Sequence, residues 1–292
     1  MSKAIAVLHG AFGRAAVYHL DRSLLSHAHR EGHLLFHVGA ALPVLRISDE
    51  TRVIGSDMAG LINPWQPHSM SVSEGGTGVI CLVLYIRPEW SQHLSENSKF
   101  QGLRFGRAFI DLTEGARALV DRIAAELLGA NHANQTEQFE RVLFELTQTC
   151  FDLSWRATPP RQHQIGMTGC FRDSRISRSL RLMAECIDMG DNLVLESIAH
   201  QAGLSRPHFF KLFREQLGLT PNIYLNTLRM EHAIERLTAS QDQITTIGLN
   251  LGFSYQASFS RFFVTNGGIA PSDYRRAAAS DRRGKKGDNT GE

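Results

Sequence analysis

The stretch AGLSRPHFFKLF, residues 202–213, has the pattern of a tight turn followed by a short helix. Gly203 can supply the left-handed conformation that ends a preceding helix, and Ser205 stands where a side-chain oxygen can cap the next one. Pro207 is tolerated there because the first turn of a helix has no hydrogen-bonded amide to lose. The stretch therefore predicts a helix-turn-helix unit.

The same pattern returns in LGFSYQASFSRFF, residues 251–263. The glycine of the turn recurs at an offset of 49 residues, whereas the core phenylalanines recur at an offset of 50. One residue is therefore inserted at the start of the second helix, where Ser254 is the expected cap. Between the copies, Thr220 and Pro221 open a predicted helix long enough to act as a rigid spacer.

In each helix-turn-helix unit, the second helix would bury one face that carries aromatic residues and expose the opposite face. Arg and Lys can reach guanine, Gln can pair with adenine, and an apolar side chain can meet a thymine methyl group. Two such helices held about one DNA turn apart, roughly 34 Å, would enter successive major grooves. Hairpins repeated only for packing are the alternative, but solenoids generally need three or more repeats. The predicted DNA-contacting residues are Ser205, Arg206, Pro207, His208, Phe210, Lys211, Arg214, Gln256, Ala257, Ser260 and Arg261.

Residues 175–276 resemble the AraC/XylS family of bacterial transcription regulators. The resemblance is carried by SIAHQAGLSRPHFFKLFREQLGLTPNIYLNTLRMEHAIERL and by IGLNLGFSYQASFSRFF. It implies recognition helices at about 205–216 and 256–265, binding to promoter DNA, dimerisation, and activation of transcription through contact with RNA polymerase. The second copy departs from the family pattern, because Val264, Thr265 and Gly267 replace the usual basic residues and phenylalanine.

The composition predicts a soluble two-domain protein. The 292 residues are 42% apolar, enough for two cores, and the net charge of +2 neither requires nor excludes a nucleic-acid partner. The four cysteines are widely spaced without a C-x-x-C pair, which favours reduced thiols. The N-terminal MSKAIAVLHGAFG is too short and polar for a signal peptide, and no apolar run approaches the roughly 20 residues of a membrane span. We therefore expect a cytoplasmic protein without a membrane partner.

The two halves of the chain differ in pattern. Short apolar runs up to about residue 110 predict an antiparallel sandwich or barrel, and two amphipathic helices are expected near 113–130 and 135–152. The expected fold class is α+β, with an all-α C-terminal half. The predicted divisions are a front domain at 1–155, a linker at 156–172, a DNA-binding domain at 173–276 and a disordered tail at 277–292.

The family resemblance also implies that the front domain is a cupin-type sensor. The segments HAHREGH and NPWQPHSM place His27, His29, His33, Trp65 and His68 as candidate effector-binding residues. A polar-lined effector pocket with Trp65 as a stacking wall, a structural set of strand histidines, and a bound metal are three interpretations of this cluster. His37 would join the same face if the region were a single strand.

The chain has no catalytic triad, phosphate-binding glycine loop or strong metal motif, so no enzyme activity, catalytic residue or cofactor is predicted. The favoured function is a transcriptional regulator that responds to a small-molecule effector. An effector-independent regulator with a dimerising front domain, and a metal-binding cupin sensor or enzyme fused to a DNA-binding module, are the alternatives. The helices of the front domain would either form a homodimer or cover the sheet.

Overall fold

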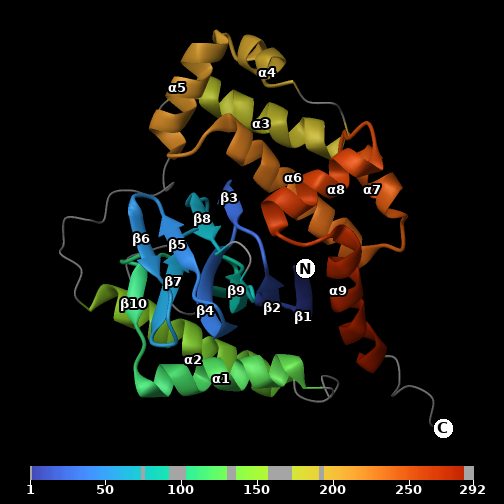
Figure 1. Ribbon diagram of the computed structural model, residues 1–292. Coiled ribbons are helices and arrows are strands. Elements are labelled where there is room, and N and C mark those ends of the chain that lie inside the picture. Colours follow the sequence, from blue (N-terminus) through green and yellow to red (C-terminus); the bar gives the residue numbers. More distant parts are fainter. Residues whose placement is uncertain are drawn as a thin grey trace.

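A computed structural model describes residues 2–73, 76–91, 103–129, 136–156, 173–190 and 194–285. It confirms the α+β prediction: antiparallel sheets form the front half, and helices form the C-terminal half above and beside them (Figure 1). The predicted linker at 156–172 lies outside the described residues apart from Arg156. None of the described helices has the length and apolar character needed to cross a bilayer.

The front half contains two antiparallel sheets. The larger has the strand order β1-β2-β9-β4-β7-β10, and the smaller has the order β3-β8-β5-β6. The described strands are β1 (Lys3–Gly10), β2 (Gly13–Leu20), β3 (Leu24–His27), β4 (Gly32–Ala40), β5 (Val44–Ile47), β6 (Glu50–Val53), β7 (Met58–Ile62), β8 (His68–Ser71), β9 (Val79–Ile86) and β10 (Phe109–Asp111).

Strand β9 explains how the front half is layered, because almost all of its residues are buried. Side chains alternate across a strand, so Leu82 and Leu84 join one core while Val83 and Tyr85 join another. The first core lies under helices α1 (Glu114–Leu128) and α2 (Thr136–Trp155), whose apolar stripes are buried in it. This favours the alternative in which these helices cover the sheet, and the homodimer stays a prediction.

The C-terminal half contains the two predicted helix-turn-helix units, α4–α5 and α7–α8, and a long helix α6 between them (Figure 1). Gly203 and Gly252 adopt the expected left-handed conformation, with φ of 74° and 80°. The helices are α3 (Ser174–Asp188), α4 (Leu195–Gln201), α5 (Arg206–Leu217), α6 (Pro221–Ala239), α7 (Ile244–Asn250), α8 (Gln256–Gly267) and α9 (Pro271–Lys285).

Three local predictions are wrong. Ser205 occupies the N-cap of α5, but its side chain makes no capping hydrogen bond. The N-cap of α8 is Tyr255 rather than Ser254, because the inserted residue precedes it and keeps the offset of 50 from Ser205. The tail does not begin at 277, since α9 continues to Lys285 and buries Ala277 and Ala278.

The second core extends from the front half into the C-terminal half. It joins Tyr18 and Tyr85 of the large sheet to Met230 of α6, Phe263 of α8 and Tyr274 of α9. Helix α9 also lies alongside β1 (Figure 1). The helical half is therefore packed directly onto the front sandwich through buried apolar side chains.

Gly13 begins β2, next to the buried Arg14, in a conformation that favours glycine. Its φ of 125° is unfavourable for any other residue, and a Cβ there would lie 2.3 Å from the carbonyl oxygen of Tyr85. We expect Gly13→Ala to lower the free energy of unfolding by about 1–3 kcal/mol, because the strain cannot relax against backbone. Urea unfolding measures this change.

Gly115→Ala is the matched control, because an added Cβ in α1 meets nothing within 4 Å. Alanine is favoured over glycine in a helix by up to about 1 kcal/mol, so this variant should be as stable as the parent or slightly more stable. Equal stability of Gly13→Ala and the parent would contradict the proposed constraint.

Candidate DNA-binding surface and interdomain pocket

The outward face of α5 carries most of the residues predicted to contact DNA. Phe209 and Phe213 are fully buried beneath it, so this helix has the predicted orientation. Phe210 is half-buried, and the guanidinium carbon of Arg206 lies 5.3 Å from the centre of its ring. The residues of this set that are exposed are Ser205, Arg206, Pro207, His208, Lys211 and Arg214.

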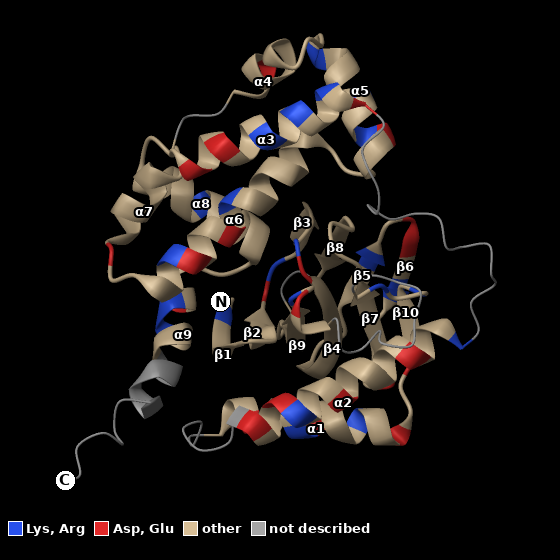
Figure 2. Ribbon diagram, turned by 180° about the vertical axis from the view of Figure 1, so that it is seen from behind, with Lys and Arg blue, Asp and Glu red and all other residues tan. Residues whose placement is uncertain are grey.

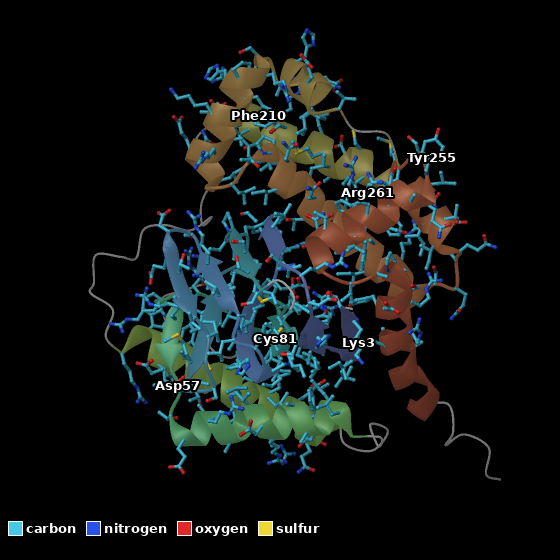
Figure 3. The ribbon with its side chains drawn as sticks, in the orientation of Figure 1. Lys3, Asp57, Cys81, Phe210, Tyr255 and Arg261 are labelled. Atoms are coloured by element: carbon cyan, nitrogen blue, oxygen red, sulfur yellow. The ribbon has the colours of Figure 1, made fainter. Side chains whose placement is uncertain are left out.

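The outward face of α8 is less basic. Gln256, Ala257 and Arg261 are exposed as predicted, whereas Ser260 is half-buried. Tyr255, which the sequence analysis missed, is 74% exposed at the N-terminus of α8. Its position fifty residues after Ser205 was the available signal. Figure 3 shows Phe210 on α5 and Arg261 with Tyr255 on α8, and Figure 2 shows basic residues on both helices.

The unusual end of α8 packs against the front domain. A Cβ at Gly267 would lie 3.1 Å from Cε of Met230, and one at Gly268 would lie 2.9 Å from the side chains of Leu20 and Leu24. At Gly218, the equivalent of Gly268 in the first unit, a Cβ would meet nothing within 4 Å. The second unit is therefore packed against the sandwich at Gly268, whereas the first unit is open at the equivalent position.

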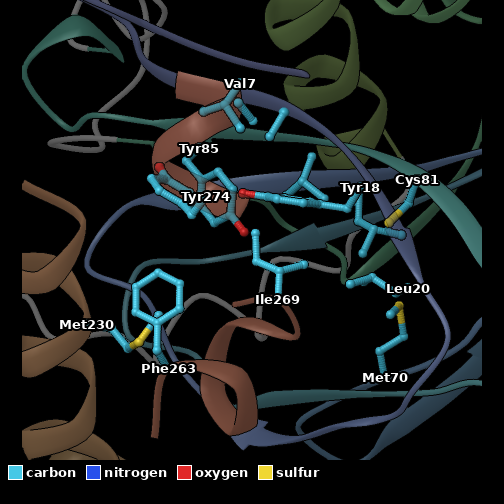
Figure 4. Packing of buried hydrophobic residues seen from close by; sticks show 14 of the residues in the cluster. Val7, Tyr18, Leu20, Met70, Cys81, Tyr85, Met230, Phe263, Ile269 and Tyr274 are labelled. Carbon is cyan, nitrogen blue, oxygen red and sulfur yellow. The ribbon is translucent and has the colours of Figure 1, made fainter. Parts of the chain in front are cut away.

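A partly open cavity of about 50 Å³ lies where the two halves meet. Its walls come from β2, β3, β4, β8 and β9 of the front half and from α6, α8 and the chain leading to α9. Figure 4 shows the apolar part of this region, with Met230 and Phe263 near Ile269 and Tyr274 near Tyr85. The volume has room for a few water molecules or a small ligand group.

Arg14 is a buried cation in the cavity wall, with only 6% of its surface exposed. Its Nη1 donates to the hydroxyl of Tyr274 at 3.2 Å, and its guanidinium carbon lies 3.7 Å from the ring centre of Tyr85. Its Nε has no hydrogen-bond partner, and no carboxylate among the described residues forms an ion pair with it. A buried charge without a counter-charge is costly, so this wall favours an anion.

The structure brings the four predicted histidines together in the same cavity wall. His27 of β3 pairs directly with His68 of β8, while His33 pairs with Tyr85 in the large sheet. Ring centres are 4.3 Å apart for His27 and His68 and 4.9 Å apart for His29 and His33. Burial lowers the pKa of all four imidazoles. They are therefore neutral near pH 7.

His37 and Trp65 do not lie in the wall of this cavity. His37 would join the histidines only if they shared a single strand, and they do not, because β3 ends at His27 and β4 begins at Gly32. Trp65, predicted as the stacking wall of an effector pocket, does not line this cavity. The ring of Trp65 stacks instead on Tyr224 of α6, with ring centres 4.8 Å apart.

Residues 28–31, between β3 and β4, form what we call the histidine loop. Three contacts on one face of α6, which we call the latch, hold this loop and the neighbouring Trp65. Tyr224 stacks on Trp65, the hydroxyl of Thr227 donates to the carbonyl of Ala28 at 2.9 Å, and Glu231 accepts from the backbone amide of Arg30 at 3.1 Å. Residues 224, 227 and 231 are spaced to share a helix face. Trp65 also donates its amide to the carbonyl of His29 at 2.7 Å.

Comparison with known proteins supports a DNA-binding C-terminal half. Residues 198–277 match a family model described as a helix-turn-helix domain. An uncharacterised HTH-type transcriptional regulator of Haemophilus influenzae is 29% identical over 85 residues, covering 29% of this chain and 28% of the relative. One from Staphylococcus aureus is 40% identical over 85 residues, covering 29% of this chain and 11% of the relative. The chain thus spans less than a third of the length of these relatives.

Solved structures share the fold of most of this chain. ToxT from Vibrio cholerae O395 has a TM-score of 0.56 at 14% identity, covering 90% of this chain and 97% of ToxT. Wild-type ToxT from strain SCE256, with an unsaturated fatty acid bound, has a TM-score of 0.55 at 16% identity, covering 89% of this chain and 94% of that one. These similarities show that the two-part fold is shared.

The Glu231 contact should make the stability of the protein depend on pH. The pKa of Glu231 is raised from 4.5 to about 8, chiefly by burial and then by the charge of Glu31, although Arg30 opposes the shift. Between these two values the folded protein holds a proton that the unfolded chain lacks. The contribution of Glu231 to the free energy of unfolding therefore falls as pH rises through this range.

We expect Glu231→Gln to remove much of this dependence, because the amide oxygen still accepts from Arg30 and does not titrate. Melting temperatures measured between about pH 5 and about pH 8 should fall less in this variant than in the parent. Glu235→Gln, an exposed position on the same helix, is the control and should follow the parent. Parallel curves for the parent and Glu231→Gln would contradict the assignment.

Proposed function

We propose that this chain is a sequence-specific DNA-binding transcriptional regulator whose helix-turn-helix pair is controlled by a small anionic effector. The observation that carries the DNA-binding part is the paired unit, α4–α5 and α7–α8, which lies almost entirely in the segment that matches a helix-turn-helix domain. Each unit buries two phenylalanines and leaves a polar face in solvent. Such a face suits the major groove.

Control by an effector is supported by the cavity between the two halves. Met230 of α6, Phe263 and Asn266 of α8 and Tyr274 of α9 contribute to its wall. A molecule bound there touches the DNA-binding half directly, so its binding free energy can favour one arrangement of α8 over another. The DNA-binding residues need not touch the effector.

The chemistry of the wall favours an anion with an apolar body. Arg14 supplies an unpaired buried cation, and Leu20, Leu35, Met70 and Val83 supply apolar surface. ToxT, which shares the fold, has been crystallised with an unsaturated fatty acid. We therefore propose a carboxylate as the effector group. Binding as a homodimer to direct repeats and contact with RNA polymerase are further parts of this proposal, and they rest on the resemblance of the C-terminal half to the AraC/XylS family.

Lys211 and Arg261 test the DNA-binding surface, because they occupy equivalent exposed positions on α5 and α8. We expect Lys211→Ala and Arg261→Ala each to weaken binding to the chain's own DNA site by about 1–3 kcal/mol, the usual cost of a lost bidentate base contact. Genome-wide mapping of bound sites supplies the DNA, and gel-shift titration measures the affinity.

Arg141→Ala is the control for charge alone, since Arg141 is an exposed arginine on α2. It should leave the affinity unchanged. If Lys211→Ala and Arg261→Ala both keep the parental affinity and sequence preference, the assigned surface is wrong.

Arg14 tests the effector part of the proposal. We expect at least one of butyrate, octanoate and oleate to raise the melting temperature of the parent, because a ligand that binds the folded state stabilises it. The corresponding alcohols lack the charge and should have little effect. Arg14→Met should lose the response while keeping apolar volume in the wall. Equal shifts with acids and alcohols in the parent would show that Arg14 does not select an anion.

A further inference from the structure

The histidine cluster has the geometry of a metal site. One nitrogen each from His27, His29 and His68 lies within 4.8 Å of the other two. Tetrahedral zinc with Zn–N bonds of about 2.0–2.1 Å places such nitrogens about 3.3 Å apart, so small side-chain rotations suffice to close the site. His33 lies beside this triad, with its ring centre 4.6 Å from that of His68.

The hydrogen bonds of two imidazoles fix which nitrogen is available. Nδ1 of His27 lies 2.7 Å from the carbonyl of Leu25, and Nδ1 of His68 lies 2.9 Å from the carbonyl of Gln66. A carbonyl only accepts, so Nδ1 must carry the proton in each ring. Nε2 is then the unprotonated nitrogen with a free lone pair. Metal-bound histidines show this arrangement, in which the second nitrogen donates to a carbonyl or a carboxylate.

The ligand atoms indicate the class of metal, because all three are imidazole nitrogens. Nitrogen ligands suit zinc and its first-row neighbours, while calcium and magnesium need oxygen ligands.

We propose that His27, His29 and His68 bind a divalent late first-row transition metal, such as Zn²⁺, at the boundary between the sandwich and the helical half. Three protein ligands would leave one coordination position for water or an anion, as in three-histidine zinc sites. The triad lines this cavity together with Arg14.

The latch connects the proposed metal site to the DNA-binding half through a chain of contacts. Two ligands flank Ala28, whose carbonyl accepts from Thr227, and the carbonyl of His29 accepts from Trp65, which stacks on Tyr224. Fixing the rings of His27 and His29 therefore fixes the loop that holds α6, the helix between the two units. This regulatory step rests on the proposed function, whereas metal binding itself does not.

The first experiment measures metal binding without DNA. Tag-free, full-length protein stripped with a chelator is dialysed against Zn²⁺, and bound metal is counted; Co²⁺ then reports the coordination geometry through its visible absorption. We expect one tightly held equivalent. His27→Ala and His68→Gln should each weaken binding by at least about 10–100-fold, the loss seen when even an outer hydrogen-bond partner of a metal ligand is removed.

Two variants keep this test decisive. His68→Gln retains a side-chain donor for the carbonyl of Gln66, so it separates loss of the metal from loss of the fold, which circular dichroism checks. His200→Ala removes an exposed histidine of α4 and should bind metal as the parent does. The site is overturned if the parent retains no equivalent, or if His68→Gln retains it.

The second experiment measures DNA affinity of the parent with and without Zn²⁺. We expect at least about a fivefold change, the lower end of typical allosteric coupling, and no change in His68→Gln. If the protein binds the metal but its DNA affinity does not change, the regulatory step is wrong and the metal site is still supported. A parent that binds zinc but no DNA would contradict the proposed function and not the metal site.

Discussion

The latch between α6 and the histidine loop is the constraint on which the rest of the arrangement depends. Helix α6 joins the two helix-turn-helix units. Contacts that fix the position of α6 therefore also affect the positions of both units. Its three contacts differ in kind: an aromatic stack at Tyr224, a hydroxyl donor at Thr227 and a carboxyl acceptor at Glu231. Two of them are hydrogen bonds to backbone groups of residues 28–30. They therefore depend on the backbone conformation of the loop and not on its side chains.

The large sheet explains why a charged group can lie beside this loop. Register places Arg14 of β2 and His33 of β4 on either side of Tyr85 in β9, so the three side chains form a row on one face. The tyrosine ring covers the guanidinium, and the hydroxyl of Tyr274 accepts from it. These partners shield the charge of Arg14 without neutralising it. A metal on the histidines would add positive charge nearby, and an anion between them would favour both, so metal and anionic effector should strengthen each other's binding.

Much of this was predictable from the sequence where local rules apply. The two units, their glycine turns and the orientation of Phe209 and Phe259 follow from repetition and helical spacing. The convergence of the histidines follows from short strands that pair across a sheet. The docking of the two halves was not predictable, because Met230 and Phe263 have the pattern of ordinary core residues of the helical domain. Trp65 was assigned to a ligand wall for the same reason: spacing along the chain does not reveal that Tyr224 stacks on it.

The two helix-turn-helix units differ in how closely they pack against the rest of the chain. The first unit leaves the surroundings of Gly218 open, whereas the second unit places Gly267 and Gly268 against Met230, Leu20 and Leu24. Thr227 adds a further asymmetry within the latch, because its hydroxyl lies 2.9 Å both from the carbonyl of Ala28 and from that of Ile223 in its own helix. A hydroxyl has one hydrogen to donate, so if α6 moves away from the loop, Thr227 keeps a partner within the helix. Opening this contact therefore leaves the hydroxyl of Thr227 with a partner, which lowers the free-energy cost of separating α6 from the loop.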